Sequence, residues 1–127
     1  MGLVGIVLVS HSEQLASGLA ELLSQVATPD VHVVPAGGTD DGELGTSPER
    51  ITAAIERADA GAGVLILADL GSAVLTTRAV LDEAPGPLLV DAPFVEGAVA
   101  AAVTASTGAD LATVAEAARE ARDVDKF

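Results

Sequence analysis

The sequence predicts an α/β protein, specifically a three-layer, doubly wound sandwich with a mainly parallel sheet and helices on both faces. Four short apolar runs are rich in β-branched residues and nearly continuous, which is typical of parallel strands buried on both faces. Longer segments with apolar residues at helical spacing separate these runs. Right-handed crossovers place such helices on both sides of the sheet. For this fold we expect the strand order 2-1-3-4.

The strands are expected at residues 3–9, 31–36, 64–68 and 87–90. Apolar residues at helical spacing mark a first helix by Leu15, Leu19, Leu22, Leu23 and Val26, and a second by Ile51, Ala54, Ile55 and Ala58. Residues 73–81 and 95–103 are rich in Ala, Val and Leu, so we expect helices there that pack closely on the sheet. Residues 111–122 predict a last amphipathic helix with its charged side chains in solvent.

Helix starts are marked by polar residues with capping spacing. Ser10 with Glu13 and Thr46 with Glu49 both have the spacing of a capping box. Pro48 suits the first turn of a helix. Ser72 is expected to cap the helix that follows the third strand.

Composition limits the function classes. The chain has 127 residues, half of them apolar, so we expect a single domain over residues 1–127. Its 19 acidic and 6 basic side chains give a net charge of −13, which argues against a nucleic acid or an anionic membrane as partner. There is no cysteine and no apolar run long enough to span a bilayer. We therefore expect a cytoplasmic protein.

Ligands of doubly wound sheets bind beyond the carboxyl ends of the strands, where the strand order reverses. His11 follows the first strand and Asp69 the third, and these strands are neighbours in the predicted order. The two side chains should therefore face each other across the crevice. Residues 37–47, after the second strand, form a long connection with four glycines, and such loops are often functional.

His11 has the properties of a phosphoryl acceptor. In the first turn of a helix, the positive end of the helix dipole favours a neutral imidazole, which is a nucleophile, and an added anion. Asp69 is the best candidate to accept the Nδ1 proton and direct Nε2 outward. The N–H groups of the helices that begin near Ser12 and Ser72 could hold phosphoryl oxygens, with the hydroxyls of Ser12, Ser72 and Thr39. This chemistry requires no metal and no cofactor on the chain.

Structural interpretations of the same residues remain open. His11 could be a solvated first-turn residue, and Asp69 could cap a strand end. His32, within the second strand, favours a structural or solvent-facing role. Asp40 and Asp41 favour an exposed polar loop, because no third residue is spaced for a metal site. The P-loop, dinucleotide-binding and hydrolase nucleophile motifs are absent.

Five motifs, in this order along the chain, together resemble one family. It is the DhaM family, the phosphotransfer subunits of phosphoenolpyruvate-dependent dihydroxyacetone kinases, which is related to the mannose-type EIIA domains of the sugar phosphotransferase system. The motifs are VLVSHS at 7–12, AGGTD at 36–40, GT at 45–46, DLGSA at 69–73 and APFVEGA at 92–98.

This resemblance implies a phosphocarrier. His11 would accept a phosphoryl group from phospho-HPr and pass it to ADP held on the partner subunit DhaL. The ATP formed there would phosphorylate dihydroxyacetone (glycerone) on the subunit DhaK. Asp69 would orient the imidazole, and Gly38, Thr39, Gly71 and Ser72 would line the phosphate site. The resemblance also implies a homodimer.

Two other functions remain open. One is a mannose-type EIIA component that serves a sugar permease, although the segment 69–73 lacks the Trp-Gly-Gly-Ser-Pro character of that branch. The other is a non-catalytic regulatory module that binds a small ligand on the same fold. A phosphorylation assay separates the last possibility from the first two.

Overall fold

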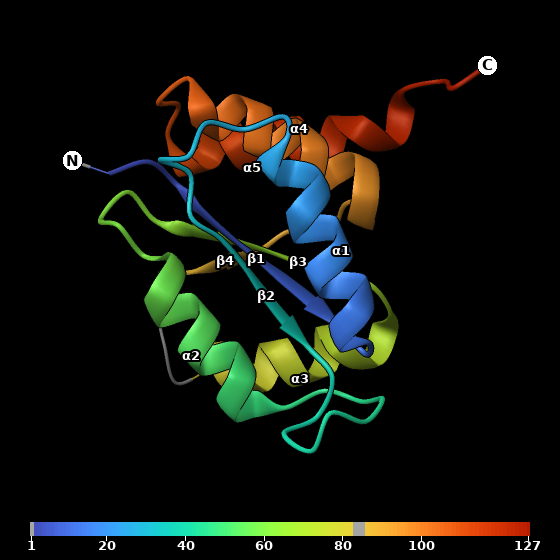
Figure 1. Ribbon diagram of the computed structural model, residues 1–127. Coiled ribbons are helices and arrows are strands. Elements are labelled where there is room, and N and C mark those ends of the chain that lie inside the picture. Colours follow the sequence, from blue (N-terminus) through green and yellow to red (C-terminus); the bar gives the residue numbers. More distant parts are fainter. Residues whose placement is uncertain (1, 83–85) are drawn as a thin grey trace.

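A computed structural model describes residues 2–82 and 86–127 of the chain. Its centre is a sheet of four parallel strands in the order β2-β1-β3-β4, which confirms the predicted order (Figure 1). The third strand has the predicted bounds, and the others differ from prediction by one or two residues at their ends. The strands are β1 (Gly5–Ser10), β2 (Val33–Gly37), β3 (Val64–Ala68) and β4 (Leu88–Leu89).

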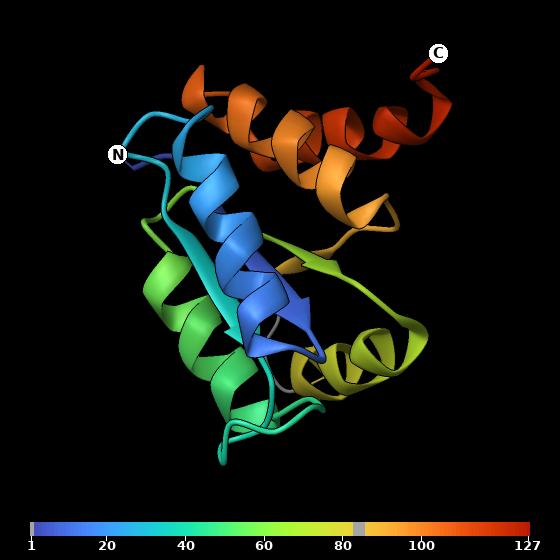
Figure 2. The same cartoon turned by 45° about the vertical axis from the view of Figure 1, so that its right-hand side comes forward.

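Helices cover both faces of this sheet, as Figures 1 and 2 show. One face packs against α1, α4 and α5, and the other against α2 and α3. This arrangement confirms the doubly wound sandwich. The helices are α1 (Glu13–Ser24), α2 (Pro48–Ala58), α3 (Gly71–Leu81), α4 (Phe94–Ser106) and α5 (Leu111–Glu120), followed by a 3-10 turn, η1 (Ala121–Asp123).

The central strand β1 is buried along its whole length because both of its faces are covered. Ile6 and Leu8 belong to the apolar cluster under α1, α4 and α5, whereas Val7 and Val9 belong to the cluster under α2 and α3. Successive side chains of a strand point to opposite faces, so one apolar run serves both cores.

The register aligns the carboxyl ends of β1, β2 and β3 at one edge of the sheet. Ser10, the last residue of β1, lies opposite Gly37 of β2, and Val9 lies opposite Ala68 of β3. The N–H of Asp69 donates to the carbonyl of Val9 at 3.1 Å. The segments that follow β1, β2 and β3 therefore begin side by side.

Two helix caps differ from prediction by one or two residues. The hydroxyl of Ser12, not Ser10, caps α1 by accepting the N–H of Leu15 at 3.1 Å. Ser47, not Thr46, caps α2, and Pro48 is its first residue as expected. Ser10 is unsuited to the role because it is the buried last residue of β1, and its hydroxyl serves another contact.

Two further expectations about helix starts were wrong. Ser72 does not cap α3, because the helix begins at Gly71 with Leu70 in the capping position and no side-chain cap. His11 does not lie in the first turn of α1, because it precedes the capping residue Ser12. The side chains of His11 and Ser72 instead contact each other at the edge of the sheet.

The apolar residues of α1 do not all face the core. Leu19 and Leu23 are buried, whereas Leu15 and Leu22 are each 46% exposed, and Val26 is exposed as well. The helix thus carries more apolar surface than the sheet and α4 cover. Within residues 2–82 and 86–127, no helix combines the length and the apolar character needed to cross a bilayer.

Candidate functional site

His11 and Asp69 meet at the carboxyl edge of the sheet. Nδ1 of His11 lies 3.0 Å from Oδ1 of Asp69, and the backbone N–H of His11 donates to Oδ2 at 3.1 Å. The N–H of Leu70 donates to Oδ1 at 2.7 Å. The structure thus brings together, in direct contact, two side chains that are 58 residues apart in the sequence.

The carboxylate of Asp69 is held in its ionised form. Burial by itself raises the pKa of Asp69, but hydrogen bonds from the Ser10 hydroxyl and from the backbone and ring of His11 outweigh it and lower the pKa overall. The side chain of Asp69 is only 9% exposed, so its negative charge is shielded from solvent. An ionised carboxylate only accepts hydrogen bonds.

This acceptor determines the tautomer of the neutral imidazole. Because Asp69 only accepts, Nδ1 of His11 carries the proton and donates a hydrogen bond to Oδ1. Nε2 then keeps its lone pair and faces the hydroxyl of Ser72, which donates to it. The nucleophilic nitrogen is therefore directed away from the carboxylate and toward the first turn of α3.

Ser10 is a site residue that sequence reasoning missed. Its hydroxyl donates to Oδ2 of Asp69 at 2.9 Å and accepts the N–H of Ser12 at 3.0 Å, and the residue is fully buried. Its one signal in the sequence is a polar side chain at the end of an apolar strand, directly before His11. We instead interpreted that signal as a capping box.

The glycine-rich segment 37–47 folds against the start of α1. The N–H of Gly38 donates to the carbonyl of Ser10 at 3.1 Å, and the N–H of Gly45 donates to the carbonyl of His11 at 2.9 Å. Both bonds hold the loop against Ser10 and His11. The loop therefore forms one wall of the site.

Gly37 permits this close approach. A Cβ atom at Gly37 would lie 2.4 Å from the carbonyl oxygen of Ser12 and 2.8 Å from Cα of Glu13. Neither backbone atom can move without shifting the start of α1. Only glycine fits here, and this role was absent from the predicted site.

On the α1 side, the predicted phosphate-lining residues already have internal contacts. The N–H of Ser12 donates to the Ser10 hydroxyl, and the N–H of Gly38 donates to the Ser10 carbonyl. The hydroxyl oxygen of Thr39 accepts the N–H of Glu43 at 3.1 Å. These residues shape the wall, and the hydroxyl protons of Ser12 and Thr39 remain as donors.

On the α3 side, Gly71 and Ser72 offer more donors. Within the described residues, the backbone N–H groups of Gly71 and Ser72 have no acceptor, as is usual for a first helical turn. They lie next to the hydroxyl that contacts Nε2 of His11. This helix end therefore presents N–H donors beside Nε2 of His11, an arrangement suited to an anion.

Two side-chain contacts join different elements around the site. Oγ1 of Thr46, in the glycine-rich loop, lies 2.8 Å from Oγ1 of Thr76 in α3, and the hydroxyl of Thr76 donates to the carbonyl of Ser72 at 3.1 Å. The second contact joins α2 to α1: the guanidinium of Arg50 lies 3.5 Å from the carboxylate of Glu13. Neither contact was predicted from the sequence.

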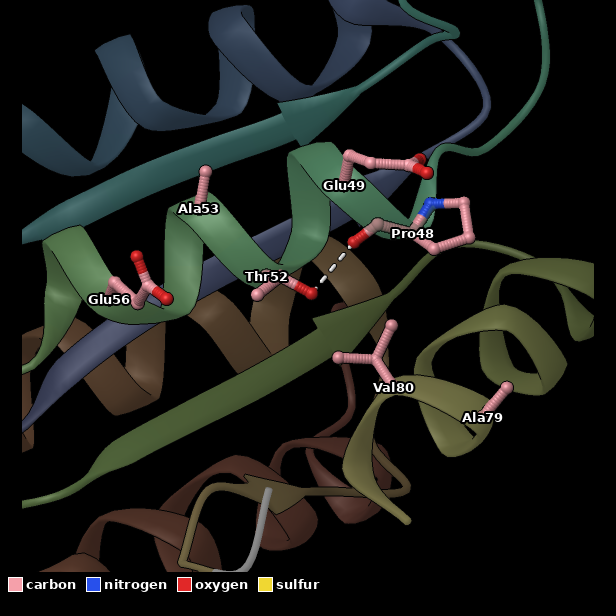
Figure 3. Close-up of a pocket in the computed structure, with 7 residues that line it drawn as sticks. All are labelled: Pro48, Glu49, Thr52, Ala53, Glu56, Ala79 and Val80. Atoms are coloured by element: carbon pink, nitrogen blue, oxygen red, sulfur yellow. Dashed lines mark hydrogen bonds between the residues drawn. The ribbon is translucent and has the colours of Figure 1, made fainter. Parts of the chain in front are cut away.

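The groove between α2 and α3 is separate from this site. It has a volume of about 600 Å³ and is shown with its lining residues in Figure 3. The hydroxyl of Thr52 donates within its own helix, to the carbonyl of Pro48 at 2.9 Å. The lining residues include neither His11 nor Asp69, so the groove has no part in the chemistry described above.

In residues 2–82 and 86–127, no three side chains of His, Asp or Glu gather as metal ligands.

Comparison with known proteins decides the family. The family model EIIA-man, described as "PTS system fructose IIA component", matches residues 5–115. The chain belongs to the EIIA-man family. The match includes His11, Asp69 and the glycine-rich loop.

Proteins similar to the chain include dihydroxyacetone kinase subunits. The chain is 39% identical over 106 residues to the "PEP-dependent dihydroxyacetone kinase 2, phosphoryl donor subunit DhaM" of Listeria innocua, with 80% of this chain and 85% of that protein covered. It is 37% identical to the "PTS-dependent dihydroxyacetone kinase, phosphotransferase subunit DhaM" of Lactococcus lactis, with 88% and 90% covered. The corresponding DhaM of Escherichia coli is longer, and the match (36% identical, over 86% of this chain) spans 25% of it.

Solved structures share the fold. A crystal structure of the protein EF1359, of unknown function, superposes with a TM-score of 0.84 at 40% identity and covers 94% of this chain and 95% of its own. A sigma-54 interaction domain protein from Enterococcus faecalis superposes with a TM-score of 0.71 at 14% identity, over 96% of this chain and 92% of its own. At that identity the second likeness concerns the fold alone.

Proposed function

We propose that the chain is a phosphocarrier, the phosphoryl donor subunit of a phosphoenolpyruvate-dependent dihydroxyacetone kinase. One observation supports this most directly. The ring of His11 is held by ionised Asp69 with Nε2 free of the carboxylate and next to the open N–H groups of α3. The names of the Listeria and Lactococcus relatives support the same role.

The first transfer phosphorylates His11. The lone pair of Nε2 attacks the phosphorus of phospho-HPr, so an N–P bond forms on His11 while the bond to the donor's nitrogen breaks, and its electron pair returns to the donor. Nδ1 keeps its proton throughout. The positive charge that develops on the ring is stabilised by Asp69, 3.0 Å away.

The phosphoryl oxygens then need donors in place of water. The hydroxyl of Ser72 turns from Nε2 to a phosphoryl oxygen, and the N–H groups of Gly71 and Ser72 complete the cradle with the hydroxyls of Ser12 and Thr39. The cradle contains neutral donors only. It therefore holds the group without a strong electrostatic bond that would hinder its onward transfer.

The second transfer removes the phosphoryl group from His11. An oxygen of the ADP β-phosphate, held on DhaL, attacks the phosphorus, the N–P bond breaks, and its electron pair returns to Nε2. The ATP formed there phosphorylates dihydroxyacetone on DhaK. The nucleotide stays on the partner, so the chain itself carries no cofactor in this role.

Intact-mass measurement tests the proposal. The protein is incubated with phosphoenolpyruvate, enzyme I and HPr, and we expect it to gain the mass of one phosphoryl group. His11→Ala should abolish the gain. The chain has two histidines, so His32→Ala, in an exposed position, is the matched control and should retain it. A His11→Ala protein that still gains the group would contradict the proposal.

A sugar-transport EIIA component is the second candidate, and the description of the matched family favours it. The acceptor distinguishes the two roles. Phosphorylated protein mixed with ADP-loaded DhaL should form ATP in the first case, whereas in the second it should transfer only to an EIIB domain. A protein that binds a small ligand but never gains mass would be a regulatory module instead.

In the proposed role the chain forms one EIIA-like domain over residues 1–127, acts in the cytoplasm and associates as a homodimer. The domain, the location and the homodimer are all inferred from the sequence. Light scattering after size exclusion checks the homodimer, with twice the chain mass of 12.6 kDa as the expected result.

A further inference from the structure

The side chain of Arg50 joins three elements beside His11. One guanidinium nitrogen donates to the carbonyl oxygen of Thr39 in the glycine-rich loop at 3.4 Å, and the other lies 3.5 Å from the carboxylate of Glu13 in α1. Arg50 itself lies in the first turn of α2. The starts of α1 and α2 and the loop between β2 and α2 lie at the same end of the sheet, as Figures 1 and 2 show.

Glu13 brings a negative charge close to the reactive imidazole. It is the first residue of α1 and follows His11 by two positions. It also packs against the loop, because a Cβ atom built on Gly38 would lie 3.4 Å from Cβ of Glu13. Gly38 directly precedes Thr39, a donor of the proposed phosphoryl cradle. The carboxylate of Glu13 therefore borders that cradle.

The loop next to this carboxylate is itself acidic. Asp40, Asp41 and Glu43 are exposed there. In the part of the chain that the structure describes, the other Arg and Lys side chains with an ion-pair partner lie in α5, η1 and the segment after it, and they are Arg119, Arg122 and Lys126. Arg50 is thus the basic side chain bound at this border, in a chain with a net charge of −13.

A phosphoryl group on His11 would be repelled by Glu13 if that carboxylate were unpaired. The group brings about two negative charges at pH 7. Charges in a partly exposed site interact more strongly than they do in bulk water, although solvent and salt still weaken the interaction. Paired with Arg50, Glu13 adds no net charge, so the neutral donors of the cradle determine how tightly the group is held.

We propose that the Glu13–Arg50 pair sets the phosphoryl-transfer potential of His11, that is, the free energy of its phosphorylated form relative to the donor. The inference rests on the proposed function and deepens it. Without Arg50, the carboxylate would destabilise the phosphorylated form. Without Glu13, the guanidinium would stabilise that form and oppose release of the group. Both are positioning residues that act through charge, and the pair keeps the group easy both to accept and to release.

The equilibrium constant for phosphoryl exchange with HPr tests the pair. Purified phospho-HPr is mixed with the unphosphorylated chain, and the N–P bond of the donor breaks as the N–P bond on His11 forms. Intact mass then gives the phosphorylated fraction of each protein at equilibrium. Docking of the two proteins changes the rates but not this constant, because the constant depends only on the free energies of the separate proteins. Arg50→Gln should lower it about fivefold, and Glu13→Gln should raise it about fivefold.

Two further variants separate charge from structure. Glu13→Gln combined with Arg50→Gln removes both charges, so the constant should return to within about twofold of wild type. Arg50→Lys keeps the positive charge and should restore most of what Arg50→Gln loses. In about 1 M salt, where the Debye length is roughly 3 Å, the shifts of both single variants should shrink. Loss of a merely structural contact does not produce opposite shifts that cancel.

Arg119→Gln is the matched control. Arg119 lies 3.4 Å from Glu116 in a similarly exposed pair on α5, and its loss changes the net charge of the chain by the same amount. The equilibrium constant should stay at the wild-type value. Urea unfolding of Arg119→Gln and Arg50→Gln should be alike, because exposed ion pairs contribute little to stability.

Three results would overturn the inference. The first is an equal constant for wild type and Arg50→Gln. The second is a double variant as low as Arg50→Gln, which would place the role of Arg50 in holding Thr39 and not in balancing charge. The third is an equal loss in Arg119→Gln, which would trace the effect to net charge alone. Wild-type protein that gains no phosphoryl group from phospho-HPr would instead overturn the proposed function, and the inference with it.

Discussion

The hydroxyl of Ser10 donates a 2.9 Å hydrogen bond to Oδ2 of Asp69. The hydroxyl oxygen of Ser10 also accepts the N–H of Ser12, so this one buried side chain joins the end of β1, the segment after β3 and the cap of α1. With Oδ2 occupied, Oδ1 remains to accept the ring proton of His11. Ser10 is thus a positioning residue for the carboxylate.

Removing this hydroxyl should affect both stability and transfer. Ser10→Ala takes one donor from Asp69 and leaves the N–H of Ser12 without its acceptor, so we expect a loss of about 1–2 kcal/mol in the free energy of unfolding. The pKa of Asp69 should rise, because the lost hydrogen bond lowers it in the wild type. Urea unfolding and carboxyl NMR titration measure these effects, and phosphorylation of His11 should be slower.

The matched control for Ser10 is Thr77, the other hydroxyl that is fully buried among residues 2–82 and 86–127. Thr77 donates only to the carbonyl of Ala73 in its own helix. Thr77→Val should therefore leave the Asp69 pKa and the rate of phosphorylation at wild-type values. A normal Asp69 pKa in Ser10→Ala would contradict the positioning role.

Asp69 should give the protein an acid-sensitive component of stability. Its folded-state pKa is depressed, so its contribution is fully present above the unfolded pKa of about 3.9 and is lost as the pH falls through the folded value. Between about pH 5 and pH 3, the free energy of unfolding of Asp69→Asn should fall less than that of wild type. Equal slopes for the two proteins would show that the carboxylate is not stabilised by folding.

The same substitution tests the tautomer. An amide in place of the carboxylate no longer holds the proton on Nδ1 of His11 or balances the charge on the ring. Phosphorylation of Asp69→Asn should therefore be slower by about a hundredfold or more, as for loss of other catalytic proton partners. Rapid-quench kinetics with phospho-HPr measures the rate, and a value near wild type would exclude this role for Asp69.

The contact between Thr46 and Thr76 should matter for transfer more than for stability. Thr76→Val removes the hydroxyl that joins α3 to the glycine-rich loop, and we expect phosphorylation to slow by about tenfold as the walls of the site shift. The free energy of unfolding should change by less than about 1 kcal/mol. Thr52→Val is the control, because Thr52 makes the same bond to its own helix but joins no second element. Equal rates for the two variants would contradict this role.

Gly37 should tolerate no side chain. Gly37→Ala places a Cβ against the carbonyl oxygen of Ser12, so we expect a loss of about 2–3 kcal/mol in the free energy of unfolding. Gly18 offers the opposite control within α1, since a Cβ there meets nothing within 4 Å. Gly18→Ala should stabilise the protein by about 0.5–1 kcal/mol. Thermal and urea unfolding of both variants checks the pair.

Much of this architecture could be predicted from local pattern. Continuous β-branched runs separated by segments of helical spacing predict a doubly wound sandwich, and the right-handed crossover rule leaves few topologies for it. The order expected among them, 2-1-3-4, is the one observed. In that order β1 and β3 are neighbours, so His11 and Asp69 are expected to face each other. The structure brings Nδ1 and Oδ1 of these residues, 58 positions apart, to 3.0 Å.

The caps show where local pattern was insufficient. Ser10 and Ser12 both lie near the start of α1, and the capping-box spacing favoured Ser10. The choice depends on burial: Ser10 lies inside the sheet, where β3 supplies Asp69 as its acceptor, and Ser12 is left to cap. The same competition moved the second cap from Thr46 to Ser47, because the hydroxyl of Thr46 lies against Thr76.

By itself, the sequence determined the α/β class and the positions of His11 and Asp69 directly after two strands, because these follow from the spacing of apolar residues. The tertiary structure alone decided which hydroxyl holds Asp69, which contacts join the walls and which leucines stay exposed. Those outcomes depend on what neighbouring elements place against each side chain, and that information lies in segments far away along the chain.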